Sequence, residues 1–216
     1  MKEPTKTLQL IYGALNDHFG DLHWWPGESS IEIIIGAILT QNTAWRNVEI
    51  AINRLGRQGL LDQKKLLCVK DEILEELIKP SGYYRIKAKR LKAFIHFLFE
   101  YYHGKLDDLF DNDIDVLRSQ LLRVKGIGEE TADSIILYAA EKPIFVVDAY
   151  TRRILERHSL IEQGLKYGDI QKYFMNHLPA DVYLFKQYHG LIVNTGKTYC
   201  TKAAKCEMCP LQILIS

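Results

Sequence analysis

The spacing of apolar side chains predicts helices over nearly the whole chain. Between Thr5 and Phe19 apolar residues recur three and four positions apart, the interval that gathers them on one helix face. From Ile31 to Gln41 almost every position is apolar, which predicts a buried central helix. The same pattern predicts further helices at Ala44–Leu55, Glu72–Ile78, Lys87–Tyr102, Asp113–Leu122, Glu130–Tyr138, Asp148–Arg157, Tyr167–Leu178 and Ala180–Asn194.

Two short segments interrupt this helical pattern. Pro80-Ser81-Gly82 marks a break, since proline and glycine both disfavour the interior of a helix. Ile144–Val147 is rich in strand-forming residues, but one short strand without partners is not stable by itself. The predicted fold class is therefore all-α.

Composition narrows the class of protein without indicating a function. Of 216 residues, 47% are hydrophobic and 25% charged, values typical of a soluble protein with one large or two small domains. The apolar stretches are too short to cross a bilayer and no secretory leader opens the sequence, so we expect a cytoplasmic protein without a membrane partner. With a net charge of +1, any nucleic acid must be bound through local basic patches.

The segment from Leu117 to Ala140 predicts a helix-hairpin-helix. A tight turn, Lys125-Gly126-Ile127-Gly128, separates two predicted helices. Its glycines accept positive φ and let another surface approach the backbone amides, which suit a phosphate at the positive end of the following helix. An ordinary turn between two helices explains the glycines alone equally well.

Several further motifs accompany the hairpin. They are Leu39–Thr43, Pro80–Leu91, Leu122–Ala132, Asp148 within Val-Val-Asp-Ala-Tyr-Thr-Arg-Arg, His189-Gly190 and the C-terminal cysteines. Together they resemble the helix-hairpin-helix/Asp (HhH-GPD) superfamily of base-excision DNA glycosylases, in its endonuclease III-like branch. The resemblance covers roughly residues 28–210.

This resemblance implies a partner and several binding residues. The partner is double-stranded DNA containing damaged bases, in the nucleoid of a bacterium or archaeon. Gln41 would fill the gap left by a flipped nucleotide, and the hairpin would contact the DNA backbone. The resemblance also implies a monovalent cation at the hairpin, held by main-chain carbonyls of Leu122, Val124 and Ile127. Nothing in the sequence indicates an oligomer, so we expect a monomer.

Asp148 is the predicted catalytic residue. Breaking an N-glycosidic bond develops positive charge on the deoxyribose, which a carboxylate stabilises while it positions or deprotonates the attacking water. An aspartate directly before a helix is also a favoured N-cap. The two roles are compatible.

Glu130 decides between two kinds of glycosylase. In the family's bifunctional members, the residue two positions after the second hairpin glycine is a lysine that cleaves the strand through a Schiff base. Here that residue is Glu130, and a carboxylate cannot form an imine. The resemblance therefore predicts a monofunctional enzyme that leaves the abasic site intact. A glutamate also suits the start of a helix, where negative charge is favoured.

The tryptophans predict the substrate. All three lie between residues 24 and 45. Trp24-Trp25-Pro26, with an aromatic shortly after Gln41-Asn42-Thr43, resembles the 3-methyladenine DNA glycosylases of endonuclease III type. An aromatic cage attracts the positive charge of an N3-alkylated purine. Trp24 is expected to pack in the core, the common role of tryptophan, whereas the predicted base pocket consists of Trp25, Pro26, Trp45 and Glu130.

A run of basic residues in the middle of the sequence predicts phosphate contacts. Five positive charges fall within eight residues, from Arg85 to Lys92. Lys87 and Lys89 are assigned to the DNA backbone. A solvated helix face explains part of this charge run equally well.

Cys200, Cys206 and Cys209 predict a metal or cluster site, because clustered cysteines of an intracellular protein seldom form disulfides. The resemblance implies a [4Fe–4S] cluster, usually held by four cysteines. The position of the fourth is occupied by Ile215, and Cys68 lies far away in sequence. A non-cysteine fourth ligand, a shortened chain, a lost site and a zinc ion remain alternatives.

The predicted architecture is two helical domains with a DNA-binding cleft between them. Residues 28–133 form a helical barrel that includes the hairpin, and residues 1–27 with 134–216 form the domain that carries Asp148 and the cysteines. Two other functions remain open. One is a glycosylase of the same fold for mismatched or otherwise damaged bases, and the other is a helix-hairpin-helix module that binds DNA without catalysis.

Overall fold

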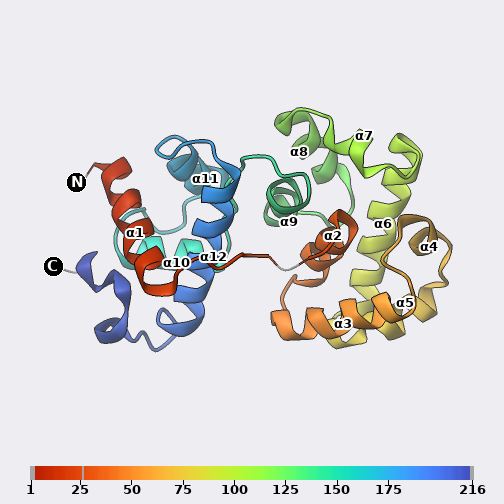
Figure 1. Ribbon diagram of the computed structural model, residues 1–216, viewed down its shortest axis with the longest axis horizontal. Helices are drawn as coiled ribbons and strands as arrows, with labels where there is room; N and C mark the ends of the chain where they lie inside the picture. Colours follow the sequence, from red (N-terminus) through yellow and green to blue (C-terminus); the bar gives the residue numbers. More distant parts are fainter. Residues whose placement is uncertain (1–2, 26, 215–216) are drawn as a thin grey trace. The chain divides into compact units, whose positions relative to one another are not determined.

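The computed structural model describes residues 3–25 and 27–214 and divides into two compact units. The contiguous unit is Pro26–Lys142, and the split unit combines Met1–Trp25 with Pro143–Ser216. Within the described ranges all regular structure is helical, which confirms the predicted all-α class (Figure 1). No helix in these ranges is long and apolar enough to cross a lipid bilayer.

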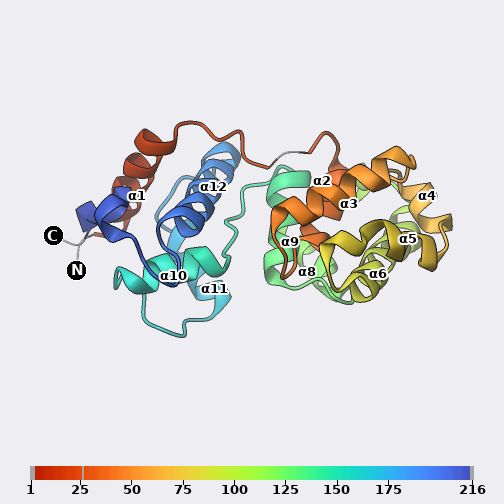
Figure 2. The ribbon, with the colours of Figure 1, turned by 90° about the horizontal axis from the view of Figure 1, so that it is seen from below.

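The contiguous unit is built around α2 (Ser30–Leu39), which confirms the predicted central helix. The side chain of Ser29 caps α2 by accepting a hydrogen bond from the backbone N–H of Glu32. Ile31, Ile34, Ile35 and Ile38 are buried, and the helix packs against α3, α6 and η2 (Figure 2). The remaining helical elements of this unit are α3 (Trp45–Arg57), α4 (Gln63–Cys68), α5 (Asp71–Ile78), η1 (Lys79–Ser81), α6 (Tyr84–Tyr102), α7 (Leu106–Phe110), α8 (Ile114–Arg123), α9 (Glu129–Ser134) and η2 (Ile135–Ala139).

The helix-hairpin-helix consists of α8, a turn, and α9. Gly126 has φ +92° in this turn, a conformation that side chains rarely adopt, and the backbone N–H of Ile127 donates to the carbonyl of Val124 at 3.0 Å. One helix was predicted for Glu130–Tyr138, but the structure changes to a π-helical turn at Ile135. The apolar spacing alone does not distinguish these two kinds of helix.

The split unit is formed by segments from both ends of the sequence. In both views α1 lies beside α12 and the C-terminal turns (Figures 1 and 2). Phe145 stacks on Phe174 with ring centroids 3.8 Å apart, and the ring of Tyr188 packs edge-on against both. The helical elements of this unit are α1 (Pro4–Phe19), α10 (Ala149–Arg157), α11 (Tyr167–Met175), α12 (Val182–Thr198), η3 (Cys206–Met208) and η4 (Pro210–Leu214).

The segment Ile144–Val147 is extended, buried and not part of a strand. Side chains take the place of a neighbouring strand. Gln171 Nε2 donates to the carbonyl of Phe145 at 2.7 Å, and the hydroxyl of Tyr167 accepts from the backbone N–H of Val147 at 3.2 Å. Buried backbone groups need such partners, so this segment leads to Asp148 in a fixed conformation.

Candidate active site and cysteine cavity

Asp148 is the N-cap of α10, and its side chain is 11% exposed. Its Oδ1 accepts hydrogen bonds from the backbone N–H of Thr151 at 2.7 Å and from the Thr151 hydroxyl at 2.8 Å. Its Oδ2 lies 3.7 Å from Nε2 of His189. Burial raises the pKa of Asp148, but His189 and the Thr151 hydrogen bonds together hold it below its usual value. The carboxylate is therefore ionised at neutral pH.

His189 is a further candidate residue of the active site, which the sequence indicates only as part of the motif His189-Gly190. It lies on α12, is 5% exposed and faces Asp148 from a distant part of the chain. A histidine within the apolar run Tyr188–Val193 was the available signal. The sequence alone does not show what that histidine faces.

Trp24 packs against α12, in agreement with its expected structural role. A Cβ on Gly190 would lie 2.6 Å from Cγ of Trp24, so glycine at this position makes room for the indole. The Nζ of Lys197 lies 5.6 Å from the Trp24 ring centroid, within reach of a cation–π contact.

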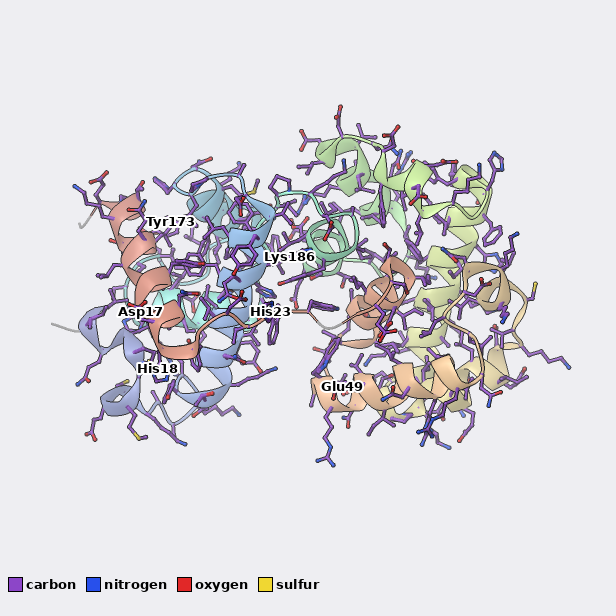
Figure 3. The ribbon with its side chains drawn as sticks, in the orientation of Figure 1. Asp17, His18, His23, Glu49, Tyr173 and Lys186 are labelled. Carbon is purple, nitrogen blue, oxygen red and sulfur yellow. The ribbon has the colours of Figure 1, made fainter. Side chains whose placement is uncertain are left out.

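The other aromatic residues of the predicted pocket belong to both units. Trp25 of the split unit is half-buried and has φ +80°, whereas Pro26 lies outside the described residues. Trp45 opens α3 of the contiguous unit, and its Nε1 donates to Oε1 of Glu49 at 2.9 Å (Figure 3). The assembly of these residues into one pocket with Glu130 stays a prediction.

Gln41 is held against the hairpin. Its Nε2 donates to the carbonyl of Gly126 at 3.1 Å and to the Thr131 hydroxyl at 2.9 Å. Its Oε1 accepts from the guanidinium of Arg90, whose side chain also covers Gly126. To enter a DNA duplex, Gln41 must exchange these contacts for contacts with bases.

The predicted phosphate contact of Lys87 is wrong. Its side chain is 1% exposed, and Nζ donates to the carbonyls of Leu39 at 2.8 Å and Ser81 at 2.6 Å. Burial and the neighbouring Arg90 lower the pKa of Lys87 to about 8. The ammonium group therefore joins the end of α2 to the break before α6, and cannot reach DNA. Lys89 and Lys125 are exposed, as a phosphate contact requires.

Glu129 and Glu130 form the first turn of α9, where negative charge is favoured by the helix dipole. Glu129 lies 3.4 Å from the guanidinium of Arg118, which also forms an ion pair with the buried Asp133 at 2.7 Å. Glu130 is exposed directly after the hairpin. The position that the resemblance assigns to a lysine nucleophile is thus accessible and carries a carboxylate.

The three C-terminal cysteines border one cavity of about 170 Å³ in the split unit. His158 and Arg157 line it as well, and Nη1 of Arg157 donates to Sγ of Cys200 at 3.2 Å. Burial and the nearby sulfurs of Cys200 and Cys206 raise the pKa of the Cys209 thiol. In the described ranges, no three His, Cys, Asp or Glu side chains converge as the ligands of a single metal ion do.

The chain belongs to a class of DNA repair enzymes. Residues 35–180 match the HhH-GPD superfamily base excision DNA repair protein, and the chain belongs to this family. "Putative DNA repair glycosylase MJ1434" of Methanocaldococcus jannaschii is 47% identical over 204 residues, which cover 94% of this chain and 92% of that protein.

Solved structures show the same similarity. The H. pylori 3-methyladenine DNA glycosylase bound to 1,N6-ethenoadenine is 26% identical with a TM-score of 0.77, covering 90% of this chain and 97% of that one. A trapped endonuclease III–DNA covalent intermediate gives a TM-score of 0.83 at 22% identity, covering 97% and 94%. The second likeness shows the fold alone.

Proposed function

We propose that this protein is a monofunctional glycosylase that hydrolyses the N-glycosidic bond of alkylated purines, 3-methyladenine above all, in double-stranded DNA. The observation that carries the proposal is the Asp148 carboxylate, buried yet kept ionised by His189 and Thr151. Such a fixed negative charge stabilises the positive deoxyribose of the transition state and orients the attacking water. The likeness to a 3-methyladenine glycosylase of H. pylori supports the choice of substrate.

The positive charge of an N3-alkylated purine makes it a good leaving group, so the reaction needs no general acid. Trp25 and Trp45 are the proposed stacking partners of the flipped base. Glu130 leaves the enzyme without the amine that forms a Schiff base. The expected product is an intact abasic site, made by a monomer working in the cytoplasm beside the chromosome.

We also propose a [4Fe–4S] cluster at the cavity that the three cysteines border. Three thiols face one cavity but do not converge on a single ion, and Arg157 supplies a positive charge to the Cys200 sulfur. Cys200, Cys206 and Cys209 would hold the cluster, which would tie the C-terminal loop to the end of α10. No step of the base-release reaction depends on it.

Base release from methylated duplex DNA tests the function. We expect free 3-methyladenine in the wild type, strand breaks only after alkali, and a loss of at least about a hundredfold in Asp148→Asn. Asp181→Asn is a matched control, because Asp181 caps α12 through the backbone N–H of Leu184 as Asp148 caps α10, but it is exposed and has no role in the proposed site. Strand breaks before alkali would contradict the monofunctional assignment. Release only from mismatched duplexes would indicate another glycosylase of the same fold, and binding without any release would indicate a non-catalytic module.

A further inference from the structure

The cavity bordered by the cysteines offers three sulfur ligands, one fewer than a [4Fe–4S] cluster usually has. A [4Fe–4S] cluster is usually held by four protein ligands, one for each iron. Cys200, Cys206 and Cys209 supply three. Ile215 occupies the sequence position where a fourth cysteine is expected, and Cys68 belongs to α4 of the contiguous unit. The cavity wall itself offers further side chains that can bind iron.

We infer that the imidazole of His158 is this fourth ligand. His158 lines the same cavity as the three cysteines. Its backbone N–H donates to the carbonyl of Ile154 at 3.1 Å, which fixes the residue at the C-terminal end of α10. Throughout residues 3–25 and 27–214, no group is hydrogen-bonded to this imidazole. A ring nitrogen is consequently available to bind an iron.

The neighbouring Arg157 already holds the cysteine loop at this end of α10. Its guanidinium donates to Cys200 Sγ at 3.2 Å and to the carbonyl of Thr201 at 2.6 Å. The turn that carries His158 is thus connected directly to one of the sulfur ligands. α10 also packs along α12, the helix that leads into Cys200.

The other polar side chains on the cavity wall fit the role less well. The hydroxyl of Tyr199 is hydrogen-bonded to Nε2 of His18 at 2.9 Å. The hydroxyl of Thr195 donates to the carbonyl of Leu191 at 2.8 Å inside α12. Arg157 is a cation and Gln212 a weak ligand for iron. Imidazole is an established ligand of iron–sulfur clusters, where it replaces a thiolate and raises the reduction potential.

Spectroscopy of the full-length protein tests this inference, which rests on the proposed cluster. Protein made with iron supplied and purified without oxygen should contain iron and sulfide and absorb in the visible range. Pulsed electron paramagnetic resonance of the reduced cluster should show the hyperfine coupling of one directly bound nitrogen. In His158→Cys the cluster should remain, without this nitrogen coupling and with a lower reduction potential. His158→Ala should lose more than about half of its iron, since the lost ligand normally contributes to affinity.

A matched control separates ligation from folding. His177 also follows a helix of the split unit, but its Nδ1 lies 2.8 Å from the carbonyl of Tyr173 and it does not line the cavity. His177→Ala should therefore match the wild type in iron content and spectrum. Iron in the wild type without nitrogen coupling, or an unchanged His158→Ala, would overturn the role of His158. A protein with zinc alone, or without metal, would overturn the cluster itself and leave the proposed glycosylase untouched.

Discussion

At the scale of single residues, Glu130 is the position that we propose distinguishes hydrolysis from strand cleavage. It is exposed on the first turn of α9, directly after the hairpin. Replacing its carboxylate with an amine changes the available chemistry, because an amine attacks the sugar carbon and forms an imine. The helix dipole there lowers the stability of a positive charge only modestly, by about 0.3–1 kcal/mol.

We therefore predict that Glu130→Lys gains a covalent intermediate with DNA. Borohydride should trap it on methylated duplexes, whereas the wild type should give none. Glu129→Lys is the matched control, since it places the same amine one residue away on the same turn. Equal trapping by Glu129→Lys or by the wild type would contradict the assignment of position 130.

His189 is one of the two residues that lower the pKa of Asp148, which has a consequence for pH dependence. The pKa of Asp148 is lowered in the folded protein, so its carboxylate stabilises the fold above the unfolded pKa, and that contribution disappears as the pH falls through the folded pKa. Its catalytic charge should persist from neutral pH down to about pH 5.

In His189→Asn we predict that the pKa of Asp148 rises, because the imidazole no longer lowers it. The rate of base release, measured under single-turnover conditions, should begin to fall at a higher pH than in the wild type as the solution is made more acidic. His177→Asn should leave this pH unchanged, since His177 contacts the carbonyl of Tyr173 instead. Identical pH profiles in the wild type and His189→Asn would show that His189 has no such role.

At the scale of elements, the two hairpin glycines have different reasons to be glycine. Gly126 combines φ +92° with an Arg90 side chain whose Cγ would lie 2.3 Å from an added Cβ. Gly128 has φ −97° and nothing within 4 Å of an added Cβ. The fold itself therefore requires only the first.

We predict that Gly126→Ala destabilises the protein by about 1–3 kcal/mol, measured by urea unfolding, because the strained backbone and the displaced Arg90 both add to the cost. Gly128→Ala should leave stability within about 0.5 kcal/mol. If a DNA phosphate approaches the amide of Gly128, the same variant should bind duplex DNA more weakly. Unchanged affinity would remove the hairpin amide from the interface.

Local signals predicted much of this fold and less of the site. The spacing of apolar residues identified α2, α10 and α12, and the glycines identified the hairpin. The helices α4 and α7 were missed because six and five residues give too few turns for a repeat. Lys87 was misassigned because a lysine in a charge run looks exposed, and only the folded chain brings the carbonyls of Leu39 and Ser81 to its ammonium group.

At the scale of the whole molecule, the two ends of the sequence meet in the split unit. The Tyr188 hydroxyl donates to the carbonyl of Leu8 at 2.8 Å, and α1 packs against α12 and η4. Leu8 is fully buried, whereas Leu10 on the same helix is 44% exposed. The first helix is therefore part of the core of the split unit.

We predict that Leu8→Ala lowers the free energy of unfolding by about 2–5 kcal/mol. It should also speed hydrogen exchange of amides in α12 and η4, which are far from residue 8 in sequence. Leu10→Ala should change neither. Mass spectrometry of exchanged peptides measures both effects, and an effect confined to α1 would show that this helix is only peripheral.

Because the split unit combines both ends of the sequence, the two units must finish folding in a fixed order during translation. The contiguous unit Pro26–Lys142 leaves the ribosome complete and can fold while translation continues. The helix that precedes it must wait for α12 and η4, which are made more than a hundred residues later. The surroundings of Asp148, which include His189 of α12, therefore form last, so a chain that ends before α12 can retain the folded hairpin but not the partner that lowers the pKa of Asp148.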